Sequence, residues 1–334
     1  MEAKEWMPAD LLQLSGGYWG TCALHAGVRL DLFTPLAERP FTLAELANLL
    51  DMSPRGLSML MDALAALGLL EKKGEAFVTS PSAVRFLART SPDYLGHIIL
   101  HHHHLMAGWA HLHEAVATGR PLRERVSHGE DESVRESFLL GMFNLAMLLA
   151  PRIVTQIDLT GRRRLLDLGG GPGTYAIHFC KQNPELTAVI FDLPTTKRFA
   201  EQTVARFGLS DRIGFMDGDF IARGIEGRFD VAWLSHILHG EGPHGCAVIL
   251  EKAVGALEPG GLLLVQEFIL ENTRDRPLFP ALFSLNMLVG TTEGQAYSEG
   301  EIMTMMAAAG LTALERLPIE LPNGAGIIAG TMPG

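Results

Sequence analysis

The sequence predicts a two-part α/β protein, in which a mostly helical region with a winged helix precedes a parallel sheet covered by helices. Two observations support this fold class. Up to about residue 160 the apolar residues follow helical spacing, interrupted by one short two-stranded pattern near residues 70–80. Past Gly161, short apolar runs alternate with segments of helix length, which is typical of βαβ units.

Residues 41–80 have the outline of a winged helix. Thr42 with Glu45 three residues later can form a capping box at the start of a helix. A second helix follows, and after it a two-stranded wing is expected around a turn at Gly74. The second helix offers only Arg55 as a basic residue, so we expect it to form a packing or dimer surface rather than bind DNA.

The part of the chain after Gly161 predicts a seven-stranded sheet. Five short apolar runs are each followed by a helix-length segment, so these strands are expected to be parallel and buried on both faces. Two further strands are expected near the end of the chain. The seven expected strands lie in RRLLDLG, TAVIFDLP, RIGFMDGD, FDVAWLS, GLLLVQEF, LTALERLPIE and GAGIIAGTMPG.

Composition and charge favour a globular protein that binds small molecules. Of the 334 residues, 47% are hydrophobic and 19% are charged, which is typical of a well-buried core. The net charge of −11 disfavours nucleic acid and anionic membrane surfaces as partners. Three widely spaced cysteines predict neither a disulfide framework nor a cysteine-based zinc site. With no signal-peptide pattern and no long apolar run, we expect a cytoplasmic protein without a membrane span.

A glycine-rich turn follows the first strand of the predicted sheet. The sequence LLDLGGGPG places Asp167 before Gly169 and Gly171, and such a turn lets a ligand approach the backbone closely. A dinucleotide fingerprint would need glycine at position 174, where the chain has Thr174. Asp192 ends the next strand, where a carboxylate can accept hydrogen bonds from the two hydroxyls of a ribose.

The third predicted strand ends in the sequence DGDF. Asp219 offers a second carboxylate, and Phe220 offers an aromatic face that could hold an adenine. The alternative is that Asp192 and Asp219 only cap the ends of their strands. The glycine turn, together with acids in two consecutive βα units, favours a nucleoside-containing ligand.

These motifs resemble those of class I S-adenosylmethionine-dependent methyltransferases, and within them the plant-type small-molecule O-methyltransferases. LLDLGGGPG, FDLP, DGDF and LEPGGLLLVQEFIL look like successive motifs of that family, and the winged helix resembles its dimerisation domain. The resemblance covers nearly the whole chain. It implies S-adenosyl-L-methionine as cofactor, S-adenosyl-L-homocysteine as product, and a homodimer formed through the N-terminal domain.

The resemblance also implies a division of the chain and a set of cofactor contacts. Residues 1–95 would form the winged-helix dimerisation domain, 96–160 a helical linker with substrate-pocket helices, and 161–334 the Rossmann-like, seven-stranded methyltransferase domain. The residues implied to bind the cofactor are Asp167, Gly169, Gly171, Asp192, Asp219, Phe220 and Ser235.

Three histidines lie within SHILHGEGPH, residues 235–244. In the register of the family's fourth motif, His239 falls on the catalytic base and Glu267 on the carboxylate that orients it, which leaves His236 and His244 as bystanders or pocket edge. A phenol has a pKa near 10 and an imidazole near 6.5, so a positioned imidazole can remove the proton during attack on a sulfonium methyl group. The resemblance therefore predicts methylation of an acidic hydroxyl on an aromatic or polyketide-like small molecule.

The chain differs from the family pattern at three places. Gly240–Glu241 replaces the usual Asp-Trp after the base, and Ala296 replaces a second supporting glutamate. Pro151 stands where a serine often contacts the cofactor. Because relatives with this fold perform other reactions, C- or N-methylation, or another S-adenosylmethionine-dependent reaction on the same fold, remains an alternative. A ligand-sensing winged-helix regulator is an alternative from another class.

The segment around residues 97–111 is rich in histidine. His97, His101, His104 and His111 recur at spacings that place them on one helical face. Imidazoles in this arrangement could bind a metal, which leaves a metal-dependent enzyme as a third alternative, or they could form a polar pocket wall. Because no acid or cysteine accompanies them in a known spacing, we expect no metal. The residues expected to contact substrate are His104, Phe143, Asn144, Met147, His236, Asn286 and Met287.

Overall fold

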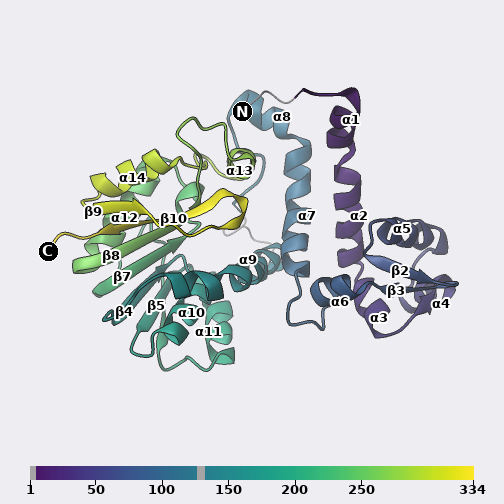
Figure 1. Ribbon diagram of the computed structural model, residues 1–334, viewed down its shortest axis with the longest axis horizontal. Coiled ribbons are helices and arrows are strands. Elements are labelled where there is room, and N and C mark those ends of the chain that lie inside the picture. The colour runs from purple at the N-terminus through teal and green to yellow at the C-terminus, as the bar shows by residue number, and fades with distance from the viewer. Residues whose placement is uncertain (1–4, 126–131) are drawn as a thin grey trace. The chain divides into compact units, whose positions relative to one another are not determined.

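The computed structural model of the protein describes residues 5–125 and 132–334 (Figure 1). The chain divides into two units, residues 1–105 and 106–334. The division falls within helix α7 (Gly96–Ala110).

The first unit is mostly helical, with a small sheet. Its capping box is formed as expected, because the Thr42 hydroxyl accepts a hydrogen bond from the Glu45 amide while the Glu45 carboxylate accepts one from the Thr42 amide. The predicted wing is the pair β2 and β3, and β1 extends it to an antiparallel sheet of order β1-β3-β2. The elements are α1 (Pro8–Gly16), α2 (Tyr18–Arg29), α3 (Phe33–Glu38), β1 (Phe41–Thr42), α4 (Leu43–Leu49), α5 (Pro54–Ala66), β2 (Leu70–Lys73), β3 (Ala76–Thr79) and α6 (Pro81–Leu87).

The second unit is built on a seven-stranded sheet of order β6-β5-β4-β7-β8-β10-β9. Strands β4 to β8 pair in parallel, and β10 pairs antiparallel with β8 and β9. The Rossmann-like, seven-stranded prediction is therefore confirmed. The strands are β4 (Arg164–Leu168), β5 (Thr187–Asp192), β6 (Ile213–Asp217), β7 (Phe229–Ser235), β8 (Leu257–Phe268), β9 (Thr312–Arg316) and β10 (Ala325–Thr331).

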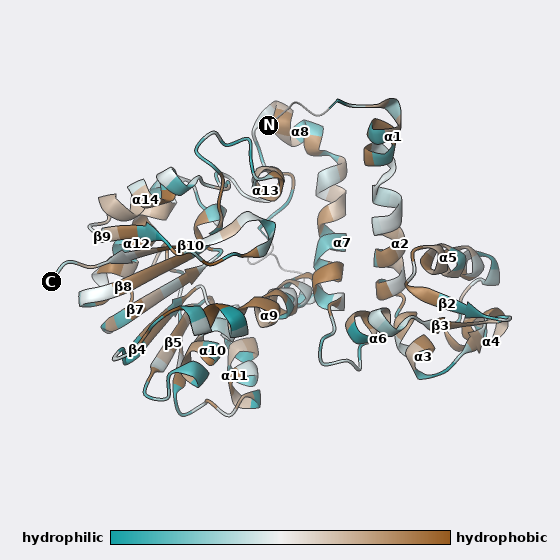
Figure 2. Ribbon diagram, viewed as in Figure 1, coloured by the Kyte–Doolittle hydropathy of each residue, from teal (hydrophilic) through white to brown (hydrophobic). Residues whose placement is uncertain are grey.

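Helices cover both faces of this sheet (Figure 1). On β4, Leu165 packs into one core with α10 and α11, whereas Leu166 and Leu168 pack into another with α12 and α14. This alternation follows from the period of two in a strand, and because both faces are buried the central strands are mostly apolar, with hydrophilic positions toward their ends (Figure 2). The helices are α8 (Leu112–Thr118), α9 (Glu132–Ile153), α10 (Thr174–Gln182), α11 (Lys197–Arg206), α12 (Pro243–Gly255), α13 (Leu278–Gly290) and α14 (Glu299–Ala308).

One described helical segment, Glu132–Gln156, is long and apolar enough to cross a membrane by length and composition, with a mean hydropathy of 1.7. The sequence analysis did not expect such a segment. A core helix passes the same test, and Ala150 and Ile153 of α9 belong to the core that α10 also enters. The segment is therefore weak evidence for a membrane protein.

The capping box at the start of α4 predicts a measurable loss of stability in Thr42→Ala. Removing the hydroxyl leaves the Glu45 amide without its cap, which costs about 1 kcal/mol of the free energy of unfolding. Urea unfolding followed by circular dichroism would measure it. Ser53→Ala is the matched control, because Ser53 caps α5 without a side-chain hydrogen bond and should lose less. Equal losses in both variants would contradict the assigned role of Thr42.

Candidate functional site

The glycine turn joins β4 to α10 at the carboxyl edge of the sheet. Gly169, Gly171 and Gly173 all have positive φ values, of 66°, 53° and 79°. A Cβ on Gly169 would overlap the Ile237 side chain, so a larger residue does not fit there. Beside Gly171 there is open space. The turn therefore combines a left-handed backbone with an open side that a ligand can approach.

Asp192 faces this turn from the end of β5. Its carboxylate accepts hydrogen bonds from the amides of Gly171 at 2.8 Å and Leu193 at 2.6 Å, and from the Thr196 hydroxyl at 3.1 Å. Burial raises the pKa of Asp192, while these hydrogen bonds and the charge of Arg125 act in the opposite direction. The carboxylate is thus held beside the open face of the turn, in a position suited to a ribose.

Asp167 lies under the turn and is only 1% exposed. Burial raises its pKa to about 7, although the Ala176 amide donates a hydrogen bond to its carboxylate at 3.2 Å. Gly170, which had no predicted role, lies beside this side chain: a Cβ at position 170 would be 2.6 Å from the Asp167 carboxyl carbon. Gly170 therefore leaves the space that the Asp167 side chain occupies.

Asp219 and Phe220 follow the end of β6 but differ in their surroundings. The Phe220 ring lies 3.6 Å from where a Cβ on Gly169 would be, so it borders the glycine turn. Asp219 is exposed, and its carboxylate accepts a hydrogen bond from the Ile221 amide at 2.8 Å. Asp219 therefore caps the segment after β6, which is the alternative to cofactor binding stated in the sequence analysis. Its contact with a cofactor stays a prediction.

Ser235 ends β7, and its hydroxyl donates a hydrogen bond to the Gln266 side chain at 3.2 Å. Gln266 is fully buried, and its Nε2 has no hydrogen-bond partner in the described part of the chain. Tyr175 is buried beside this pair, and burial raises its pKa to about 12. Sequence reasoning missed Gln266 and Tyr175. The orphaned amide is a donor that a bound ligand could satisfy.

His239 follows strand β7 and Glu267 lies near the end of the neighbouring strand β8, so the fold brings the two side chains together. His239 lies in the 3-10 turn Leu238–Gly240, and Glu267 lies in β8 with 2% of its side chain exposed. The His239 Nδ1 is 2.8 Å from one Glu267 carboxylate oxygen, and the His239 amide donates to the other at 3.2 Å. Because a carboxylate only accepts hydrogen bonds, Nδ1 carries the proton of this contact, and in the neutral imidazole Nε2 then has the lone pair.

The charge state of Glu267 follows from its two histidine neighbours. Burial by itself would raise its pKa, but the two nearby imidazoles and the hydrogen bonds from His239 outweigh burial and hold the pKa below its usual range. His236 lies farther away, with Nδ1 3.6 Å from the carboxylate, which exceeds a hydrogen bond. The possible ligand atoms of these three residues lie within 4.8 Å of one another, as they also would in a metal site.

Phenylalanine side chains surround the two imidazoles. The His236 ring packs on Phe268 with centroids 4.3 Å apart, and the His239 ring meets the edge of Phe283 at 4.8 Å. Phe279 contacts both of these phenylalanines and is 39% exposed. Sequence reasoning missed this aromatic cluster, defined by Phe268, Phe279 and Phe283, although FxxxF in α13 is a signal for one helix face.

The predicted substrate contacts on α9 are partly buried. Met147 lies 3.4 Å from the His178 ring nitrogen, with its sulfur facing α10. The side-chain amide oxygen of Asn144 is buried without a hydrogen-bond partner among the described residues. Among the described residues, neither Phe143 nor Asn144 contacts His239 through a hydrogen bond, an ion pair or a ring contact. Their substrate role stays a prediction.

The predicted contacts on α13 have structural partners. Asn286 accepts a hydrogen bond from the Trp109 indole at 3.1 Å. Met287 is 7% exposed, and its carbonyl oxygen accepts a hydrogen bond from the Thr291 hydroxyl at 2.7 Å. Neither contact tests a role in substrate binding.

The histidines near residue 100 do not share one continuous helix face. His97, His101 and His104 lie on α7, but His111 lies beyond its end, where its Nδ1 contacts the Ala107 carbonyl oxygen at 2.9 Å. The prediction was therefore wrong for His111, because α7 ends at Ala110. Over residues 5–125 and 132–334, the only three-membered group of potential metal ligands is His236, His239 and Glu267, without these histidines. The substrate role of His104 stays a prediction.

Comparisons with known proteins agree over nearly the whole chain. A family model described as an O-methyltransferase domain matches residues 109–312, and one described as an O-methyltransferase dimerisation domain matches residues 12–89. The tetracenomycin polyketide synthesis 8-O-methyl transferase TcmO of Streptomyces glaucescens is 34% identical over 95% of both chains. The 3-hydroxy-5-methyl-1-naphthoate 3-O-methyltransferase of Streptomyces sahachiroi is 32% identical over 97% of this chain and 95% of that relative.

A solved structure shows the same fold with a bound ligand. Human N-acetylserotonin methyltransferase in complex with SAM superposes with a TM-score of 0.86 at 25% identity, covering 100% of each chain.

The buried Asp167 predicts a pH dependence of stability in the ligand-free protein. An acid whose folded pKa is raised destabilises the fold as pH rises from the unfolded pKa near 4 to the folded pKa near 7. Stability relative to Asp167→Asn should therefore fall by up to about 4 kcal/mol between pH 4.5 and pH 8. Chemical denaturation of both proteins across this range measures the difference. A difference that does not change with pH would show that Asp167 is already ionised in the fold.

Proposed function

Because the chain belongs to the family of S-adenosylmethionine-dependent O-methyltransferases with an N-terminal dimerisation domain, we propose that it methylates an acidic hydroxyl of an aromatic or polyketide-like small molecule, with His239 as general base. The observation that carries this proposal is the contact between His239 Nδ1 and the buried Glu267 carboxylate. It leaves Nε2 as the proton acceptor.

Each group of the pair has a defined task. The Nε2 lone pair of His239 accepts the hydroxyl proton while the oxygen attacks the methyl carbon, and the imidazolium that forms is stabilised by Glu267. The two hydrogen bonds from His239 to Glu267 hold the backbone and the ring together, so the ring orientation does not depend on the missing second glutamate at Ala296.

The turn between β4 and α10 supports the cofactor assignment. S-adenosylmethionine supplies a sulfonium methyl group as the electrophile. Asp192 lies beside the open face of Gly171, where it can accept hydrogen bonds from ribose hydroxyls, and Phe220 offers a ring next to Gly169. The Ser235–Gln266 pair leaves one amide donor for the methionine end of the ligand. Asp167 supports the turn from below.

The aromatic cluster supports an aromatic acceptor. Phe268 and Phe283 contact the rings of His236 and His239, so a planar ring can stack beside the base. The two bacterial relatives are named for a polyketide-derived acceptor and a hydroxynaphthoate. We propose that the substrate of this chain belongs to the same broad class.

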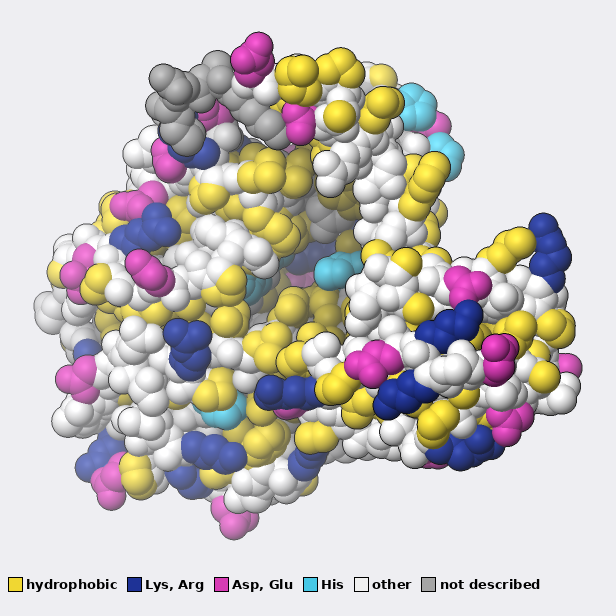
Figure 3. Space-filling view, turned by 45° about the vertical axis from the view of Figure 1, so that its right-hand side comes forward, with side chains coloured by type: hydrophobic (Ala, Val, Ile, Leu, Met, Phe, Trp, Pro, Cys, Tyr) yellow, Lys and Arg dark blue, Asp and Glu magenta, His cyan; other side chains and the backbone are white. Residues whose placement is uncertain are grey.

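The alternatives make different predictions. For C- or N-methylation, the NMR spectrum of the product would show a carbon- or nitrogen-bound methyl group instead of a methyl ether. For a regulator, salt-dependent DNA binding is expected, whereas on the face drawn in Figure 3 basic and acidic side chains are interspersed without a basic patch. For a metal enzyme, a chelator would abolish activity.

We further propose a cytoplasmic homodimer. The match to the dimerisation domain covers residues 12–89, and α1 and α2 expose large apolar side chains. Those more than half exposed between residues 11 and 19 are Leu11, Leu12, Leu14, Tyr18 and Trp19. A second copy that covers them removes this apolar surface from water. All three cysteines are free thiols, which fits a reducing compartment.

Replacing the base predicts a loss of turnover without a loss of cofactor binding. His239→Gln should lower kcat by about 10²- to 10⁴-fold on a hydroxylated acceptor, because general-base catalysis is lost. Glu267→Gln should lower kcat by less, since the base remains but its tautomer is no longer held. Calorimetric affinity for S-adenosylhomocysteine should stay near the wild-type value in both variants.

His244→Gln is the matched control for this experiment. It removes a histidine from the same segment that is exposed at the start of α12. Its kcat should equal that of the wild type. Unchanged turnover in His239→Gln would exclude His239 as the base while leaving the family membership intact.

The exposed apolar residues of α1 and α2 predict a variant that is a monomer. Leu12→Glu combined with Trp19→Glu places charges on side chains that are 73% and 70% exposed, which the fold of one copy tolerates but a dimer contact does not. Sedimentation velocity should report a monomer for this variant and a dimer for the wild type. Leu49→Glu, on α4 and 57% exposed, is the control. A dimer in the double variant would place the interface elsewhere.

A further inference from the structure

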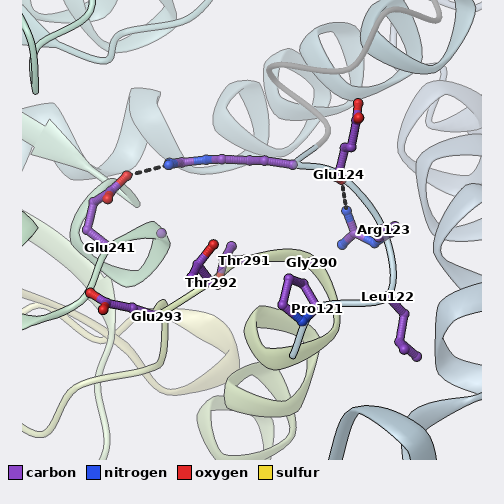
Figure 4. Close-up of a pocket in the computed structure, with 11 residues that line it drawn as sticks. Pro121, Leu122, Arg123, Glu124, Glu241, Gly290, Thr291, Thr292 and Glu293 are labelled. Atoms are coloured by element: carbon purple, nitrogen blue, oxygen red, sulfur yellow. Dashed lines mark hydrogen bonds and ion pairs between the residues drawn. The ribbon is translucent and has the colours of Figure 1, made fainter. Parts of the chain in front are cut away.

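A cavity of about 610 Å³ lies beside the 3-10 turn that carries His239. Its walls come from three segments of the second unit, residues 121–125, Gly240–Glu241 and residues 290–293 (Figure 4). The loop that follows α13 borders both places, because Thr291 lies in the cavity wall and Gly294 packs against the carbonyl group of His239. The cavity and the base are therefore neighbours along one short loop.

Two arginines reach this cavity from one segment. Arg125 forms an ion pair with Glu241, and the two side chains are 32% and 22% exposed. A Cβ on Gly240 would overlap the Arg125 guanidinium. The Gly240–Glu241 pair that departs from the family pattern thus provides both the space and the partner for Arg125.

Arg123 has a different environment. Its Nε is buried without a hydrogen-bond partner in the described chain, and its Nη1 reaches only the Glu124 carbonyl oxygen at 3.3 Å. A Cβ on Gly290 would overlap its guanidinium, so this glycine makes room for it. Burial lowers the pKa of Arg123, and no carboxylate of the described residues forms an ion pair with it. A guanidinium remains charged even so, and a half-buried charge without a counterion is costly.

The acidic groups around the cavity do not neutralise Arg123. Glu241 is already paired with Arg125. Glu293 is exposed, and its carboxylate lies against Gly242, on the opposite side of the cavity from Arg123 (Figure 4). The Glu124 side chain is exposed and points away from the Arg123 guanidinium (Figure 4). The wall formed by Arg123 therefore presents an uncompensated positive charge.

We propose that Arg123 binds a carboxylate of the methyl acceptor, so that the substrate is an aromatic hydroxy acid. This inference rests on the proposed function and specifies its substrate class. A planar guanidinium matches a carboxylate through two parallel hydrogen bonds, and Arg123 lines the cavity without a carboxylate partner of its own among the described residues. The hydroxyl of the same molecule then lies toward His239, since the base and the cavity border the same loop.

The test compares acceptors that differ only at the position of the carboxyl group. The probes are 3-hydroxy-1-naphthoate, its methyl ester and 2-naphthol, which share the same ring hydroxyl. The wild type should prefer the acid, and in Arg123→Met the ratio of kcat/KM for acid over ester should fall by about 10- to 100-fold. Arg123→Lys should restore part of the preference. Arg120→Met is the matched control, because Arg120 is exposed on the same segment and lies outside the cavity wall.

The outcomes separate this inference from the proposed function. Equal use of acid and ester by the wild type and Arg123→Met would overturn the carboxylate site while supporting hydroxyl methylation. If none of the probes is methylated, the proposed function fails for this class, and fluorescence titration of 3-hydroxy-1-naphthoate then decides. Binding that Arg123→Met weakens tenfold or more supports the site, and unaltered binding overturns it. If Arg123→Met instead weakens S-adenosylhomocysteine binding and leaves the acid preference intact, the arginine binds the cofactor carboxylate and the inference is wrong.

Discussion

The buried carboxylate of Glu267 is the group on which the geometry of the site depends. A charged side chain that is 2% exposed needs partners, and in this fold both of its oxygens receive hydrogen bonds from one residue, His239. The ring and the backbone of His239 are therefore fixed together. Because Glu267 lies in β8, which pairs with β7 on one side and β10 on the other, the position of the base is determined by a strand inside the sheet.

The opposite side of the site follows a similar logic. Asp192 is held at the end of β5 by three hydrogen bonds, one of which comes from the glycine turn itself. Asp167 is buried under that turn, where burial favours its neutral form. The two acids are thus chemically different, since one is anchored beside the ligand surface and the other supports the backbone. The cofactor contacts of both acids stay predictions.

One departure from the family pattern, Gly240–Glu241, has partners of its own in the structure. Gly240 and Glu241 looked like losses around the base, but Arg125 occupies the space over the glycine and pairs with the glutamate. Tyr297 donates a hydrogen bond to the Glu241 carbonyl oxygen at 2.6 Å, and Cys246 donates one to that of Leu238 at 3.2 Å. The turn that carries His239 is therefore supported without the usual Asp-Trp pair. The Arg125–Glu241 ion pair that takes its place lies in the wall of the neighbouring cavity.

Features that depend on residues close together in the chain were predictable from the sequence. The period-two and helical patterns predicted the strands and helices, glycines predicted the turn at 169–173, and the Thr42–Glu45 spacing predicted a capping box. The pairing of His239 with Glu267 was predicted from the register of a known family motif.

Which side chains meet across the fold could be learned only from the packed structure. Arg125 and Glu241 are 116 positions apart, and no local pattern marks such a pair. The two-residue strand β1 is too short to show a period, and the burial that raises the pKa of Asp167 exists only after the sheet has closed over it. Local propensity selects the elements, whereas contacts between distant side chains depend on how those elements pack.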